Sequence, residues 1–84
     1  MKNKVLISLI VPALMDEFEI FIPVNERVSK IKELLINSLS DLTDNEFNKD
    51  KNYSLIDPEN GTIYENSMII REMDVKNSKK IVLY

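Results

Sequence analysis

Few of the residues that usually carry enzyme chemistry occur in this chain. Its 84 residues contain no histidine and no cysteine. The usual nucleophile–base pairs and thiolate metal sites therefore cannot be assembled. A Ser–Lys or carboxylate dyad would have to be supported by the core of a very small protein. The sequence predicts a protein that is not an enzyme and that has no cofactor.

Two acidic stretches could in principle bind an ion. The first contains Asp41, Asp44, Glu46 and Asp50. These side chains could hold Ca²⁺, but they lack the regular alternation and the glycine of an EF-hand loop, so we expect a solvated loop. The second is "DPENG", residues 57–61, in which one glycine is flanked by acids that repel phosphate. We expect an ordinary turn there and no metal site.

The basic residues are grouped in one place, "KNSKK", with Lys76, Lys79 and Lys80. This cluster could contact an acidic partner or lipid headgroups, but a solvated turn that keeps the sheet soluble is favoured. The net charge is −3 and the pI is near 4.9. Since phosphate binding needs clustered positive charge, we expect no nucleic-acid partner.

The first residues, "MKNKVLISLIVPALMDE", imitate a secretory signal, because Lys2 and Lys4 precede an apolar run. Pro12 interrupts that run, and acids follow where a cleavage site would lie. The run is also shorter than the ~20 residues that a membrane-spanning helix needs. We therefore expect a buried strand in a cytoplasmic protein that does not insert into a membrane.

Alternating hydrophobic residues predict two strands at 4–11 and 17–22, joined as an antiparallel hairpin. Their core-facing residues are expected to be Val5, Ile7, Leu9, Val11, Phe18, Ile20 and Ile22. From residue 28 the spacing becomes helical, with Asn25 as the available N-cap. The apolar face of that helix is expected to contain Val28, Ile31, Leu34, Leu35, Leu39 and Leu42. A one-sided hairpin followed by a one-sided helix predicts that the two pack against each other.

The second half of the chain predicts three shorter strands. A polar connection over 40–52 leads to strands at 53–57 and 62–64, separated by the turn with Gly61. The segment 65–78 is expected to form a loop or short helical turn that closes the core with Met68, Ile69 or Ile70, Met73 and Val75. The last strand covers 79–84. The order is β-β-α-β-β-β in one domain, residues 1–84, of the α+β class.

This order and three stretches of sequence resemble a known family. The stretches are "VPALMDEFEIFIPVNERVSKI", "ENGTIY" and "MDVKNSKKIVLY". The chain is similar to the YukD-like proteins, ubiquitin-like components associated with type VII secretion in Gram-positive bacteria. The resemblance implies a ubiquitin-like β-grasp fold, a mixed sheet of order 2-1-5-3-4 packed on one helix. Relatives usually carry glycine before the last strand, and here Asn77 can adopt the left-handed conformation instead.

That strand order places large hydrophobic residues on the sheet face that no helix covers. The predicted docking residues are Leu6, Ile10, Phe21, Val82 and Tyr84. Contiguous exposed apolar patches on small proteins often mark partner sites. The alternatives are scattered surface hydrophobics, or a register shifted by one residue, which would exchange every residue with its neighbour.

The resemblance implies a non-catalytic adaptor or regulatory accessory protein of a type VII-like secretion system. It would act by protein–protein docking in the cytoplasm and could be recruited to a membrane secretion complex. A ubiquitin-like modifier or sulfur carrier is disfavoured, because those proteins end in Gly-Gly whereas the single glycine here is Gly61. A small-molecule-binding domain and homodimerisation through the apolar face remain as further alternatives.

Overall fold

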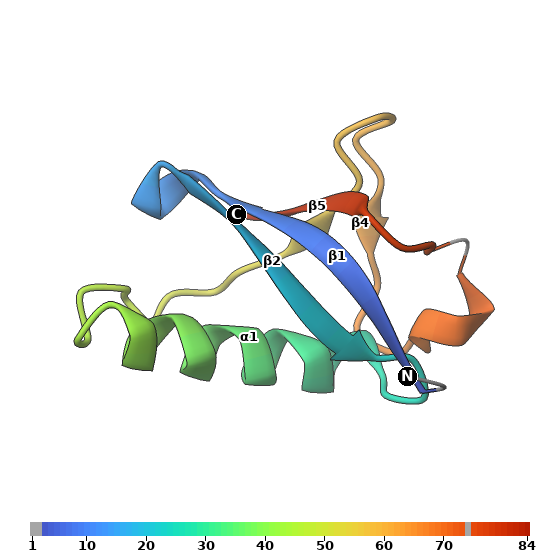
Figure 1. Cartoon of the computed structure of the whole chain (residues 1–84), viewed down its shortest axis with the longest axis horizontal. Helices are drawn as coiled ribbons and strands as arrows, with labels where there is room; N and C mark the ends of the chain where they lie inside the picture. Colours follow the sequence, from blue (N-terminus) through green and yellow to red (C-terminus); the bar gives the residue numbers. More distant parts are fainter. Residues whose placement is uncertain (1–2, 74) are drawn as a thin grey trace.

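The computed structural model describes residues 3–73 and 75–84. Lys2, part of the segment that imitates a secretory signal, and Asp74 of the closing stretch lie outside the described residues. Within these ranges the chain forms an α+β fold with one α-helix and a mixed sheet (Figure 1). The elements in chain order are β1 (Lys4–Val11), β2 (Asp16–Pro23), α1 (Val28–Leu42), β3 (Leu55–Ile56), β4 (Ile63–Tyr64) and β5 (Lys79–Leu83).

The sheet has the predicted strand order, β2-β1-β5-β3-β4. Strand β1 pairs with β2 in an antiparallel hairpin and with β5 in parallel, and β3 is antiparallel to both β4 and β5. The predicted alternation is confirmed in β1, because Val5, Ile7, Leu9 and Val11 are buried and the residues between them are partly exposed. The alternating pattern therefore predicts correctly which residues of β1 face the core. The sheet has one apolar face and one partly exposed face.

The helix α1 lies across the apolar face of the sheet, below β1 and β2 in the view of Figure 1. Four of its predicted core residues are buried: Val28, Ile31, Leu35 and Leu39. The other two were assigned wrongly, since Leu34 is 40% exposed and Leu42 is 66% exposed. Leu34 lies on the flank of the apolar stripe, and Leu42 is the last residue of the helix, so the sheet covers neither of them.

The start of α1 is stabilised by another part of the chain and not by the predicted N-cap. Arg27 occupies the cap position and makes no side-chain cap. The backbone N–H groups of Val28 and Ser29 donate to the carbonyl oxygens of Met68 (2.8 Å) and Asn66 (3.1 Å). These bonds satisfy donors that the first turn of a helix leaves without intrahelical partners. Asn25 instead accepts a hydrogen bond from the Arg71 guanidinium at 3.2 Å.

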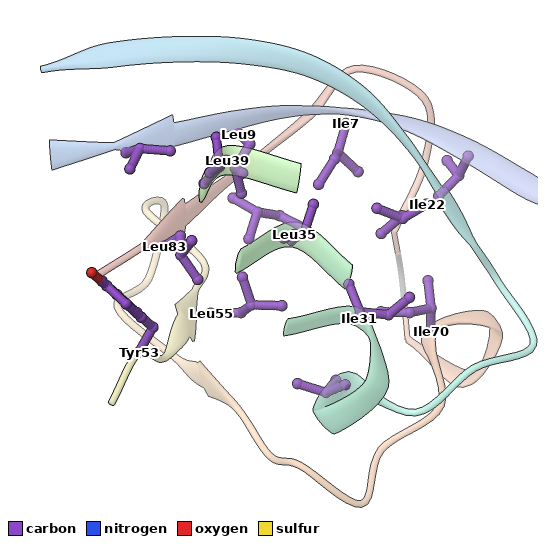
Figure 2. Packing of buried hydrophobic residues seen from close by; sticks show 14 of the residues in the cluster. Ile7, Leu9, Ile22, Ile31, Leu35, Leu39, Tyr53, Leu55, Ile70 and Leu83 are labelled. Carbon is purple, nitrogen blue, oxygen red and sulfur yellow. The ribbon is translucent and has the colours of Figure 1, made fainter. Parts of the chain in front are cut away.

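The core is one cluster between α1 and the sheet. Figure 2 shows Leu35 projecting from α1 into this cluster, with side chains from the first, third and last strands around it. Ile70 closes one end, while Met68 is exposed, so only part of the predicted plug is in the core. At the other end the Phe47 and Tyr53 rings stack with centroids 4.8 Å apart, which fixes the long connection to the core. The Tyr53 hydroxyl donates to the Asn48 carbonyl oxygen at 2.6 Å.

The turn before β5 uses its two polar residues differently from the prediction. Ser78, with φ of 70°, takes the left-handed conformation in place of Asn77. The Asn77 side-chain oxygen accepts a hydrogen bond from the Leu6 N–H at 3.0 Å, and the Ser78 N–H donates to the Leu6 carbonyl at 2.7 Å. The Asn77 side-chain oxygen thus takes the place of a backbone carbonyl from a neighbouring strand beside Leu6 of β1. Gly61, with φ of 73°, has the positive φ expected of it.

Candidate functional site

An apolar row crosses the uncovered face of the sheet. Ile10 of β1 is directly opposite Val82 of β5, Val82 is opposite Ile56 of β3, and Ile56 is opposite Ile63 of β4. Residues directly opposite one another on neighbouring strands project from the same face. Ile63 is 58% exposed and the other three are partly exposed. We call these four residues the outer row.

Tyr84 lies beside the outer row, just past the end of β5. It lies two residues beyond Val82, on the same face, and its backbone pairs with Ser54 through two hydrogen bonds of 2.9 and 3.0 Å. The side chain is 66% exposed, and the Lys51 ammonium lies 5.8 Å from the centre of its ring. Such a cation–π contact limits how the ring can move. The outer row and Tyr84 together form a surface that we call the apolar patch.

The five predicted docking residues do not form one surface. Ile10, Val82 and Tyr84 belong to the apolar patch, but Leu6 and Phe21 pair with each other elsewhere on the same face. Between the two groups lies a polar row made of Glu19, Ser8 and Lys80. Leu6 and Phe21 therefore form a separate pair outside the apolar patch.

Sequence reasoning missed two members of the apolar patch, Ile56 and Ile63. Ile56 follows the core residue Leu55 and therefore points to the opposite face. Ile63 precedes Tyr64, which is opposite Leu55 on the covered face. Both strands have only two residues, so no alternation was visible until the neighbouring strands fixed their direction.

An ion pair holds the turn between β3 and β4 against β5. The Lys79 ammonium lies 3.1 Å from the Asp57 carboxylate and 3.5 Å from Glu59, and Lys79 and Asp57 are mostly shielded from solvent. The sequence predicts that Lys79 lies in a solvated basic turn, and for Lys79 this prediction is wrong. The Glu59 N–H also donates to Asp57 at 2.9 Å. That bond and then Lys79 lower the pKa of Asp57, and the Asp57 carboxylate raises the pKa of Lys79.

This pair predicts a pH dependence of stability. A carboxyl group with a lowered pKa in the folded state stabilises the fold above its ordinary pKa of about 4 and loses that contribution as the pH falls through the lowered value. We expect Asp57→Asn to be less stable than the wild type at pH 7. The two proteins should converge in acid, as measured by urea unfolding at pH 7 and near pH 2. As a control, Asp50→Asn, at an exposed loop position, should keep the wild-type dependence. If Asp57→Asn lost as much stability in acid as the wild type, the ion pair would not contribute.

The geometry of the described residues does not support an ion site at either acidic stretch. Among residues 3–73 and 75–84, no group of three or more acidic side chains is close enough to hold a metal ion. Asp44 and Asn45 have positive φ, and the Asn45 side-chain oxygen accepts a hydrogen bond from Ser40 at 3.0 Å, so this stretch forms a turn after α1. No helix in the described part of the chain is long and apolar enough to cross a membrane.

Comparison with solved structures identifies the fold as ubiquitin-like. The chain aligns with the N-terminal ubiquitin-like domain of the 4931431F19Rik protein at a TM-score of 0.73 and 20% identity, over 98% of this chain and 74% of that one. It aligns with the EccD5 ubiquitin-like domain from Mycobacterium xenopi at a TM-score of 0.78 and 10% identity, over 98% and 93%. No protein-family model and no curated sequence matches the chain.

Two further neighbours are a domain of a type VII secretion system protein and a chain of an inner membrane complex. The ubiquitin-like domain of EccD1, a type VII secretion system protein of Mycobacterium tuberculosis, aligns at a TM-score of 0.75 and 8% identity, over 95% of this chain and 96% of that one. A chain of the ESX-5 inner membrane complex aligns at 0.79 and 14% identity, over 98% of this chain. This chain spans 21% of that larger one. The fold is thus shared with domains whose structures were solved on their own and with part of a larger chain.

Proposed function

We propose that this protein is a non-catalytic adaptor or regulatory accessory protein of a bacterial type VII-like secretion system. The observation that carries the proposal is the apolar patch, which crosses four strands and is covered by no helix of residues 3–73 and 75–84. In a small protein, a partly exposed apolar surface of this kind favours docking to another protein. The fold shared with EccD ubiquitin-like domains supports a partner in secretion machinery.

The chemistry of the patch supports a protein partner with a complementary apolar surface. The outer row is aliphatic, while Tyr84 and Lys51 beside it provide a hydroxyl and a charge. Aromatic residues with a polar group are typical anchors of protein interfaces. Because the neighbours include a chain of an inner membrane complex, we place the partner's docking surface on the cytoplasmic part of a membrane component.

Capture from solubilised membranes of the source organism tests this function. The tagged wild type should retain a component of a type VII-like secretion system, identified by mass spectrometry. Ile63→Asp should lose it, because a carboxylate would lie within the apolar patch. The matched control is Leu42→Asp, at the end of α1, where Leu42 is 66% exposed.

Each outcome bears on a different part of the proposal. Retention of the same component by Ile63→Asp would show that another surface docks. Capture of proteins with no role in secretion would contradict the assignment to that machinery. Both variants carry their change at an exposed side chain, so we expect them to unfold at the same urea concentration as the wild type within error.

A further inference from the structure

Strand β2 has one long edge that pairs with nothing in the described part of the chain. It has eight residues, Asp16–Pro23, and it is the outermost strand on its side of the sheet. The unpaired N–H and C=O groups of an edge strand form a template on which another strand can pair. This edge is separate from the apolar patch, which lies over β1, β5, β3 and β4.

The hydrogen bonds of β1 show which backbone groups of β2 face outward. Leu6 directs its N–H and C=O toward Asn77 and Ser78, on the side of β5. Backbone groups alternate in direction along a strand, so the odd-numbered residues of β1 must face β2. In agreement with this, the Val24 N–H donates to the Asn3 carbonyl oxygen at 2.9 Å, just beyond the end of the strands.

The even-numbered residues of β2 therefore bond to β1, and Glu17, Glu19 and Phe21 face the free edge. One of these donors is occupied, because the Glu17 N–H donates to the Asp16 side chain at 2.8 Å. The final residue, Pro23, has no N–H. The edge thus presents two N–H groups, on Glu19 and Phe21, together with the carbonyl groups beside them. That is enough for a short ladder at the centre of the strand.

An apolar surface lies beside this edge on the covered face of the sheet. Phe18 and Ile20 of β2 point to that face and are only partly buried. On α1, the Lys32 ammonium donates to the Tyr53 carbonyl at 3.1 Å, which orients that flank of the helix toward β3. Leu34 comes two residues after Lys32, which is a rotation of about 200° around the helix axis. Its side chain therefore faces the opposite flank, on the side of β2. Leu34 was expected to lie in the core, but it is exposed. It therefore provides an apolar surface below the edge.

The opposite side of the same edge is acidic. Glu17 and Glu19 project from the uncovered face of β2, and Asp16 begins the strand. A strand added here would place alternate side chains over these carboxylates and over Phe18 and Ile20. Opposite charges on neighbouring strands are stabilising, whereas a second copy of β2 would bring its own Glu17 and Glu19 to the same face. The charge pattern therefore selects a basic partner strand over self-pairing.

We infer that the free edge of β2 accepts an extended peptide segment in which basic side chains alternate with aliphatic ones. The segment adds as an outer strand and bonds to the backbone of Glu19 and Phe21. Its aliphatic side chains contact Phe18, Ile20 and Leu34, and its basic side chains contact Glu17 and Glu19. Recognition by strand addition combines main-chain hydrogen bonds, which give affinity, with alternate side-chain contacts, which give specificity.

A capped synthetic peptide in which lysine alternates with valine is the probe, titrated into the ¹⁵N-labelled protein. Saturable binding is expected, with slowed hydrogen exchange at the amides of Glu19 and Phe21. A peptide of the same composition, with its lysines and valines in separate blocks, should bind more weakly. No saturable binding, or shifts confined to the outer row, would overturn the inference. If hydrogen exchange at these two amides slowed with rising protein concentration before any peptide was added, a second copy of the protein would instead be identified as the occupant of the edge.

Two substitutions of Glu19 separate the backbone contact from the charge. Glu19→Gln removes the carboxylate and keeps the N–H, and we expect binding a few-fold weaker. Glu19→Pro also removes the outward N–H, and we expect about a further fivefold to tenfold loss. Proline is tolerated where the missing N–H faces solvent, so the β1–β2 pairing should persist. Equal binding by the two variants would exclude pairing at this edge. If Glu19→Pro does not fold, the exchange measurement on the wild type decides alone.

Discussion

Ile63→Asp combined with Tyr84→Asp is expected to weaken binding to the captured partner at least about 100-fold, because a few buried anchors carry most of an interface's energy. Ile63 lies at one end of the outer row and Tyr84 lies beside its member Val82, so the double variant places charges at two separate points of the apolar patch. Both side chains are more than half exposed in the free protein. The free energy of unfolding should therefore change by less than about 1 kcal/mol. Isothermal titration calorimetry with the purified cytoplasmic part of the partner measures the affinity.

The matched control for this prediction is Leu42→Asp combined with Met68→Asp. These residues are also exposed hydrophobics, but they lie at the end of α1 and in the loop after β4. The control adds the same charge to the protein, and we expect affinity within about threefold of the wild type. Equal losses in the two double variants would show that net charge matters, and not the apolar patch.

Leu35→Ala is expected to destabilise the fold by about 2 to 5 kcal/mol, the usual range for removing a buried leucine side chain. Leu35 is 2% exposed and projects from α1 into the centre of the core (Figure 2). A domain of this size buries only about 60% to 65% of its unfolded surface, so its stability will lie near the lower end of the common range of about 5 to 15 kcal/mol. The variant should be largely unfolded well below the melting temperature of the wild type.

Leu34→Ala is the control for Leu35→Ala, since it makes the same chemical change at the adjacent position of the same helix. Leu34 is 40% exposed, so we expect a loss of about 1 kcal/mol or less. Urea unfolding followed by circular dichroism measures both. Similar losses in the two variants would contradict the orientation of α1 on the sheet.

The fold could be predicted from the sequence where one strong period was present. Eight-residue strands and a fifteen-residue helix show their buried faces directly, and β1 and most of α1 were assigned correctly. The errors occur where tertiary contacts replace local signals. Asn25 looked like an N-cap, but the carbonyls of Met68 and Asn66 take the helix donors. Leu34 matched the helical spacing, but the sheet does not extend over that flank.

The candidate site was only partly predictable, because it depends on the pairing between strands. Ile10, Val82 and Tyr84 lie on one surface as expected. The position of Leu6 and Phe21 beyond the polar row follows from the register of β1 with β2 and β5. Ile56 and Ile63 come from two-residue strands, which are too short for a period to be visible. Only their pairing with β5 reveals that they complete the outer row.

The most direct test of docking through the uncovered sheet face is an amide chemical-shift map of the ¹⁵N-labelled protein, recorded with and without the purified cytoplasmic part of the captured partner. We predict that the largest shifts and line broadening fall on Ile10, Ile56, Ile63, Val82 and Tyr84. Residues at the exposed side of α1, such as Lys30 and Asn37, should be unchanged. Shifts concentrated on α1, with the outer row unaffected, would contradict docking through the sheet.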